Sequence, residues 1–155
     1  GQKIAEPTYP LMVAVHLSLF IGSAYEVWWY ERPFLPVLGW SMLGLLALCV
    51  AGRLWVWQSL GPQWNTQIMT TSRPITTTGP YRYVRHPNYT IVIVEIGALP
   101  LAHSAYVTAF ICSLINAFVL HQRIRLEEAA LLMRPDYRQV MAAKPRFLPA
   151  FGWRR

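Results

Sequence analysis

Long apolar stretches constrain the fold of this chain more than any other feature. Residues 9–27 are apolar apart from small polar residues, His16 and Glu26. Residues 34–57 are apolar apart from one serine and Arg53. Each stretch approaches the roughly 20 residues that span the hydrocarbon of a bilayer. Since the chain is 54% hydrophobic and only 14% charged, we expect an integral membrane protein of one domain.

A third apolar stretch, residues 89–120, is longer and harder to divide. It is too long for one ordinary span and barely long enough for two, and Pro100 and the pair His103 and Ser104 lie near its middle. We interpret it as a tight hairpin of two short spans. The sequence therefore predicts an all-α fold with about four transmembrane helices.

The polar segments between these stretches predict how the helices are joined. The short turn at residues 31–33 predicts that the first two helices form an antiparallel hairpin. Residues 61–78 are rich in threonine and broken by prolines, which predicts an irregular or partly strand-like loop. After Leu120 the pattern becomes amphipathic until Pro135, and a short helix is expected over residues 136–143.

The distribution of basic residues predicts the orientation in the membrane. Lys3 precedes the first span, several arginines lie near or between the second and third spans, and eight more basic residues follow the fourth. Arg32 alone falls in the opposite set. By the positive-inside rule, both termini and the C-terminal helical segment are cytoplasmic, in a bacterial inner membrane. We interpret the first segment as a retained helix and not as a signal peptide.

The net charge of +7 follows mostly from this topology, with attraction to anionic lipid headgroups as a further effect. We therefore expect membrane lipids as partners and no nucleic acid. Cys49 and Cys112 fall inside predicted spans, and the four histidines are too scattered for a local metal motif. No metal site is predicted, and the sequence leaves the oligomeric state open.

Two polar clusters flank the third apolar stretch. Residues 79–89 (GPYRYVRHPNY) place arginines, tyrosines and a histidine just before it, and residues 123–132 (RIRLEEAALL) place two adjacent carboxylates just after it. Pro87 suits the first turn of a helix, which puts His86 near the cap. Because the hairpin brings its two ends together, the clusters predict a single site at one membrane surface.

Four motifs carry a resemblance to a known family. They are the turn at residues 79–81, the motif at residues 85–89, the helix at residues 123–132 with its paired carboxylates, and Tyr137. In this order and spacing they resemble the isoprenylcysteine carboxyl methyltransferase and phospholipid methyltransferase superfamily, over roughly residues 53–149. The resemblance implies an integral membrane enzyme that uses S-adenosylmethionine.

We interpret residues 1–155 as one membrane domain, with a two-helix scaffold hairpin over residues 1–57 and a methyltransferase-like catalytic region over residues 58–149. The chain has no Gly-x-Gly-x-x-Gly turn after a strand, which excludes a soluble Rossmann-type methyltransferase domain. A cofactor pocket must therefore be built from the ends of the third and fourth spans and their loops, at the cytoplasmic face.

The resemblance also implies which residues form the site. Arg146 would orient the acceptor oxygen, and Glu127 would act beside it as a base or as a second carboxylate for the cofactor. The simpler alternatives are a capping role for His86, topology charges for the arginines, and a solvated pair of Arg123 and Glu127 on a helix face. The residues expected to bind the cofactor are Gly79, Tyr81, Arg85, His86, Asn88, Tyr89 and Glu128.

The chemistry of methyl transfer limits which acceptor groups are possible. The protein must hold donor and acceptor in line and exclude water. A carboxylate acceptor needs no base, whereas a phenol or enol would be helped by Glu127, Glu128 or His121. We expect a lipophilic acceptor from the bilayer, and O-methylation of a lipidic polyketide or of a prenylcysteine-like carboxylate. The ending at residues 146–149 resembles bacterial relatives, some of which methylate long-chain pyrones or resorcinols.

Three other functions remain open from the sequence. They are N-methylation of a phospholipid amine, an NADPH-dependent membrane reductase of the steroid-reductase type, and a non-enzymatic scaffold whose polar clusters anchor helices to headgroups. Glu95 lies in the middle of the third span, where a carboxylate is costly. We expect it to face the protein interior, toward Asn116 or His121.

Overall fold

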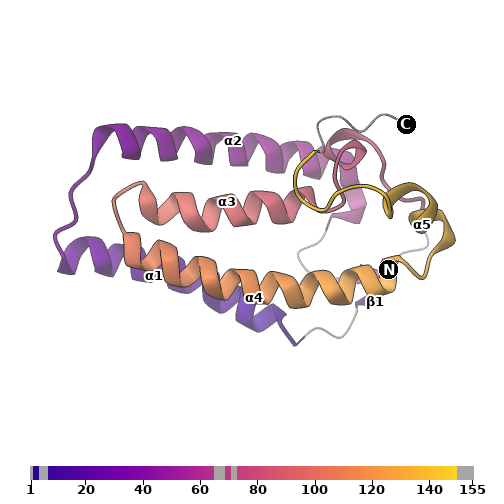
Figure 1. Cartoon of the computed structure of the whole chain (residues 1–155), viewed down its shortest axis with the longest axis horizontal. Coiled ribbons are helices and arrows are strands. Elements are labelled where there is room, and N and C mark those ends of the chain that lie inside the picture. The colour runs from indigo at the N-terminus through magenta and orange to yellow at the C-terminus, as the bar shows by residue number, and fades with distance from the viewer. Residues whose placement is uncertain (1, 4–6, 65–68, 71–72, 150–155) are drawn as a thin grey trace.

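The computed structural model describes residues 2–3, 7–64, 69–70 and 73–149 as a bundle of helices (Figure 1). Two-residue strands, β1 and β2, pair antiparallel with Lys3 opposite Met69; β2 lies in the loop of residues 61–78, where partly strand-like structure was expected. The elements are β1 (Gln2–Lys3), α1 (Tyr9–Trp29), α2 (Pro36–Leu60), the 3-10 turn η1 (Gly61–Gln63), β2 (Met69–Thr70), the 3-10 turn η2 (Gly79–Arg82), α3 (Pro87–Leu101), α4 (Tyr106–Leu131) and α5 (Pro135–Met141).

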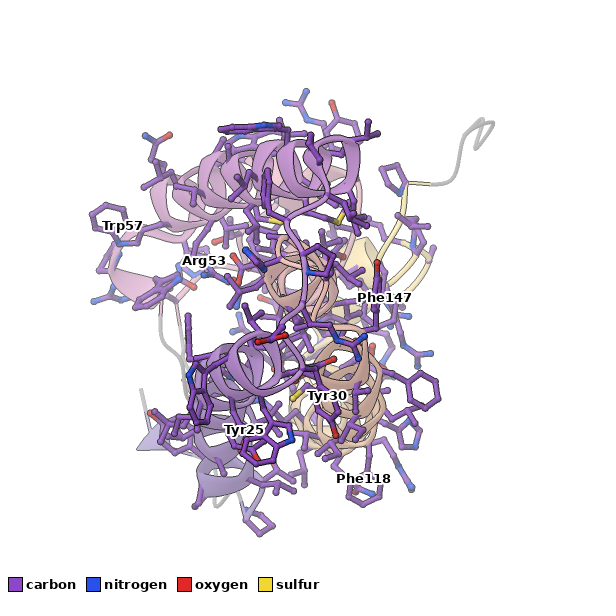
Figure 2. All side chains as sticks on the ribbon, turned by 90° about the vertical axis from the view of Figure 1, so that its left-hand side faces the viewer. Tyr25, Tyr30, Arg53, Trp57, Phe118 and Phe147 are labelled. Atoms are coloured by element: carbon purple, nitrogen blue, oxygen red, sulfur yellow. The ribbon has the colours of Figure 1, made fainter. Side chains whose placement is uncertain are left out.

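The short helix α3 lies at the centre of the bundle. It packs against α2 on one side and α4 on the other, while α1 packs mainly on α4 and less on α3. Figures 1 and 2 both show α2 on the far side of α3 from α1 and α4. The first two helices are antiparallel, as predicted, but α3 lies between them. The connection of residues 30–35 permits this, because six extended residues reach about 20 Å.

Within the described residues, three helices are long and apolar enough to cross a membrane. They are α1, α4 and the continuous segment Pro36–Gln63 that contains α2. With 15 residues, α3 is about 22 Å long, which is short of the roughly 30 Å hydrocarbon core. The expectation of two short spans is therefore wrong for α4, which continues for 26 residues without a break at Leu120. No proline or glycine interrupts residues 106–131, and the carboxylates of Glu127 and Glu128 near its end have partners.

A buried carboxylate ties α1 to the start of α4. Glu26 Oε1 accepts a hydrogen bond from the backbone N–H of Val107 at 3.0 Å, and its Oε2 accepts from the N–H of Thr108 at 2.8 Å and from the Thr108 hydroxyl at 2.7 Å. Arg32 Nη2 lies 3.1 Å from Oε1. The first N–H groups of a helix have no partner within it, so Glu26 caps α4 from another helix.

We predict that Glu26→Gln destabilises the fold, because the charge opposite the helix N-terminus and Arg32 is lost. The free energy of unfolding should fall by about 1–3 kcal/mol. Thermal unfolding in detergent, followed by circular dichroism, measures the change. Glu31→Gln, at a nearby exposed position, is the matched control. Equal unfolding midpoints for the two variants would contradict the capping role.

Candidate active site

Both polar clusters lie at the same end of the bundle, where α3 begins, α4 ends and α5 lies; we call this the α5 end (Figure 1). His86 occupies the N-cap position of α3 with Pro87 in the first turn, as the sequence predicted. The His86 ring does not cap the helix. Its Nε2 lies 2.8 Å from Glu128 Oε1 on α4. Because a carboxylate only accepts, Nε2 carries the proton in this contact.

Glu128 is the centre of a buried ion cluster. Arg146 donates to it twice, from Nε to Oε1 and from Nη2 to Oε2, both at 2.9 Å. Arg85 Nη1 lies 3.4 Å from the same carboxylate. The bond to Glu128 raises the pKa of Arg146, so this guanidinium stays charged. Such bidentate pairs are among the strongest polar contacts in proteins.

The segment that carries Arg146 crosses the start of α3. Residues 144–147 bind there through their backbone carbonyls and one lysine side chain. This arrangement fixes the chain on both sides of His86. The contacts are Arg85 N–H to Pro145 O at 2.9 Å, His86 N–H to Arg146 O at 2.9 Å, the Thr90 hydroxyl to Phe147 O at 2.8 Å, and Lys144 Nζ to Tyr81 O at 2.8 Å.

A second polar pair lies one turn further along α3. The Tyr89 hydroxyl donates to Glu127 Oε2 at 2.6 Å, and the Arg123 guanidinium carbon lies 6.0 Å from the centre of the Tyr89 ring. The Arg123 residue is only 3% exposed. The interpretation of Arg123 and Glu127 as a solvated pair is therefore wrong, because packing against Tyr89 turns this helix face inward.

A cavity of about 750 Å³ joins these groups to the apolar helices. Its size is within the range of small-molecule sites. We call the lining side chains of α1 and α2, which are mostly apolar, the apolar part, and those from η2 to the start of α3 and from the end of α4 to α5, which are mostly polar, the polar part. The apolar part includes Met12, Val13, Leu17, Phe20, Val56 and Leu60; the polar part includes Tyr81, Arg85, His86, Asn88, Tyr89, Arg123, Glu127, Arg134 and Tyr137.

The residues that the sequence analysis proposed for the site fall into two groups, those that line the cavity and those that do not. Six of them line it: Tyr81, Arg85, His86, Asn88, Tyr89 and Glu127. Among the described residues, Gly79, Glu128 and Arg146 are not part of the lining. Glu128 and Arg146 bind each other beside His86, and Gly79 packs against α2.

Tyr137 was noted only as part of a motif, yet it lies in the cavity wall. Its hydroxyl is buried, and within the described chain it has no hydrogen-bond partner; the same holds for Asn88 Oδ1 and Arg85 Nε. Burial and the nearby charge of Glu127 raise the pKa of Tyr137 to about 12. The phenol therefore stays protonated at neutral pH and is available to donate to a ligand.

The first two helices contribute more than the sequence suggested. Side chains of α1 and α2, among them His16 and Arg53, line the cavity together with those of the catalytic region. Glu95 pairs with Arg53 at 2.8 Å, so the expectation that it faces Asn116 or His121 is wrong. An ionisable residue inside a predicted span was the available signal for both His16 and Arg53.

The cavity wall is positively charged. Among the described lining residues there are five arginines and one carboxylate, Glu127. Carboxylates outside the lining approach three of the arginines: Glu95 pairs with Arg53, Glu128 with Arg85, and Asp136 with Arg134. The formal charge stays positive when these partners and Arg146 are included.

These features define a small helical membrane protein with a large cavity at one end of its bundle. A model of the isoprenylcysteine carboxyl methyltransferase (ICMT) family matches residues 42–133, and the chain belongs to this family. Its members are S-adenosylmethionine-dependent membrane methyltransferases. The chain is also similar to the protein of Bacillus subtilis (strain 168) named "Uncharacterized protein YpbQ", with 36% identity over 131 residues, 83% of this chain and 77% of that protein.

The matched region runs from α2 to just past the end of α4. It includes the turn at Gly79, the start of α3 and both carboxylates of α4. The segment at residues 144–147 lies beyond the match, so its contacts with His86 and Glu128 are a finding of the structure.

We predict that Gly79→Ala displaces the turn that carries Tyr81. Gly79 has φ +59°, and a Cβ there would collide with the Ser59 side chain and approach Trp55. A left-handed backbone alone costs a non-glycine residue about 1–2 kcal/mol. Thermal unfolding should show at least this loss. Gly44→Ala, inside α2, where a Cβ meets nothing within 4 Å, is the control and should cause no loss of stability; an equal loss in both variants would contradict the prediction.

Proposed function

We propose that this chain is an S-adenosylmethionine-dependent methyltransferase that methylates an oxygen atom of a lipophilic acceptor taken from the bilayer. The observation that carries the proposal is the cavity, which joins an apolar part along α1 and α2 to a polar part at the α5 end. In a family of membrane methyltransferases, this arrangement suits a lipid tail in one part and the cofactor with the reacting group in the other.

The residues of the polar part fit the cofactor. S-adenosylmethionine carries a carboxylate, an ammonium group, a ribose diol, an adenine ring and a positive sulfur. Arg85 and Arg123 offer cations, Glu127 offers a carboxylate, and three tyrosines offer aromatic faces. The buried, unpartnered atoms of Asn88 and Tyr137 are further groups that a bound polar molecule would satisfy.

Each group then has a role. Glu127 would accept hydrogen bonds from the ribose or the ammonium group, and Arg85 would bind the carboxylate. Tyr89 holds Glu127 in place through its hydroxyl. When bound, the cofactor supplies an electrophilic methyl group that an oxygen accepts directly. The protein's part is to align the two, exclude water and stabilise the acceptor as an anion.

The resemblance implied that Glu128 binds the cofactor and that Arg146 orients the acceptor; we propose a positioning role for Glu128 and keep the role of Arg146 with one condition. Glu128 is bound by Arg146 on both oxygens, so it would hold His86 and Arg85 in position for the cofactor. Arg146 would reach an acceptor oxygen only after this contact opens. With 52% of its side chain exposed, Arg146 has room to move.

The charge of the cavity favours an oxygen acceptor over an amine. A phospholipid amine arrives as a cation and must lose a proton, which a wall rich in arginine opposes. A carboxylate, phenolate or enolate is stabilised by the same wall. For a phenol or enol, Glu127, the carboxylate among the described lining residues, is the candidate base. A lipidic polyketide and a prenylcysteine-like carboxylate both meet these requirements.

We further propose that the α5 end faces the cytoplasm in a bacterial inner membrane. The described basic residues just before α3 and after α4 lie in segments at this end, which agrees with the positive-inside rule. The polar part of the cavity then opens to the compartment that supplies the cofactor.

The cofactor site is tested by calorimetric titration of the detergent-purified protein with S-adenosylhomocysteine. We expect saturable binding by the unmodified chain and a loss of about tenfold or more in Glu127→Gln, because one charged hydrogen-bonding group is removed. Tyr137→Phe should weaken binding while leaving the thermal midpoint unchanged, since its hydroxyl has no partner among the described residues.

Arg125→Gln, at an exposed position on α4, is the control and should bind normally. If a folded chain binds NADPH but not S-adenosylhomocysteine, the result would favour the membrane reductase over the methyltransferase. A folded chain that binds neither would favour the scaffold.

The orientation is tested with reporter fusions. Green fluorescent protein fused after Arg155 should fluoresce, because it folds in the cytoplasm. Alkaline phosphatase inserted at Glu31, in the turn between α1 and α2, should be active, because that turn lies on the opposite side. Activity of the phosphatase at the C-terminus and its absence at Glu31 would reverse the orientation.

A further inference from the structure

An arginine lies in the cavity wall that α2 contributes. Arg53 lies on α2 and contributes to the lining. Its Nη2 donates to Glu95 on α3 at 2.8 Å. Figure 2 shows Arg53 beside α3, on the side where α1 and α2 face each other. A charged residue within a membrane span is costly and calls for a physical reason.

A salt bridge that only joins α2 to α3 does not account for this geometry. Such a pair would turn both groups toward the helix interface, yet the Arg53 side chain is 40% exposed and that of Glu95 only 20%. Glu95 is not among the described lining residues, whereas Arg53 is. Within the described chain, Arg53 makes one hydrogen bond out of the five N–H groups that a guanidinium offers.

A histidine stands in the wall contributed by α1. His16 Nδ1 is 2.8 Å from the Met12 carbonyl, so it donates there and leaves Nε2 as an acceptor in the neutral ring. His16, Arg53 and Glu95 each lie seven or eight residues from the α5 end of their helix. At about 1.5 Å per residue, this places them about 10–12 Å deep. Two hydrogen-bonding side chains, His16 and Arg53, therefore lie at a similar depth within the apolar part of the cavity.

We propose that Arg53, held in position by Glu95, recognises a second oxygen of the acceptor and so determines specificity. The inference rests on the proposed function and narrows its substrate class. The acceptor would be a lipophilic molecule whose head carries two oxygen functions. One oxygen is methylated near Tyr89 and Glu127, and the other accepts a hydrogen bond from Arg53.

The distance along α3 between Tyr89 and Glu95 agrees with an acceptor that has a compact head. Tyr89 and Glu95 are six residues apart on α3. This corresponds to about 9 Å along the helix, which one ring bearing two hydrogen-bonded oxygens can bridge. The tail would extend along Leu17 and Phe20 of α1, which also line the cavity. Arg53 would touch the acceptor away from the reacting atoms, so it is a specificity residue.

The test uses two probes that differ by one oxygen. 5-Pentadecylresorcinol carries two ring hydroxyls, and 3-pentadecylphenol has the same tail but only one. Binding of each to the full chain in detergent is followed by calorimetry, with S-adenosylhomocysteine present. We expect the resorcinol to bind about 10- to 100-fold more tightly, since a hydrogen bond from a charged donor is gained.

Variants assign this difference to Arg53. Arg53→Gln should remove most of the preference while leaving the affinity for S-adenosylhomocysteine unchanged. Arg53→Lys should restore part of it, because an ammonium still donates. Arg125→Gln, an exposed arginine on α4, should behave as the unmodified chain does.

Other outcomes overturn the inference. Equal affinity of the unmodified chain for the two probes, or binding of neither, would remove the second-oxygen site. If Arg53→Gln weakened both probes equally, or lowered only the thermal midpoint, the residue would be an interhelical clamp. The proposed function is tested separately, and it fails if the unmodified chain does not bind S-adenosylhomocysteine. If the chain still distinguishes the two probes in that case, the result supports the role of Arg53.

Discussion

The carboxylate of Glu128 holds together three parts of the chain that are distant in sequence. It projects from α4, and it is bound by Arg85 and His86 at the start of α3 and by Arg146 near the C-terminus. A carboxylate that is 6% exposed requires partners of this kind, because an unpaired buried charge is strongly unfavourable. Once His86 is fixed in this way, α3 starts at a defined place against α4. Tyr89, one turn later, then meets Glu127.

The two ends of α4 are stabilised by the same principle with different partners. At its start, Glu26 of α1 binds the free N–H groups of the first turn. Near its end, Glu128 gathers cations from α3 and from the C-terminal segment. The carboxylates in both cases lie inside the protein and not toward lipid, where they would have no partner. As a result α4 is a fixed element, and the cavity is built against it by α1, α2 and α3.

The sequence predicted the parts of this structure that depend on local patterns. The apolar stretches predicted α1 and α2, and Pro87 predicted the start of α3. The two polar clusters were expected to meet at one end of the bundle, as they do. The uninterrupted α4 was not predicted, because Leu120 marks a change in polarity and not a helix break. The partner of Glu95 and the burial of Arg123 were also missed. Both depend on helices that approach only in the folded chain, and helices that face lipid show little hydrophobic periodicity to indicate which side is inward.

The shortness of α3 has a consequence for the energy of substrate capture. Because α3 is about 22 Å long, roughly 8 Å shorter than the hydrocarbon core, a bundle centred on it can set its polar groups below the level of the lipid headgroups. Each methylene group moved from hydrocarbon to water costs about 0.8 kcal/mol. A recessed pocket lets an acceptor of the proposed kind present its head while its tail stays at its usual depth. Because α1, α2 and α4 around the short α3 are long enough to span the hydrocarbon core, the recess requires no thinning of the bilayer and avoids the large cost of extracting the lipid.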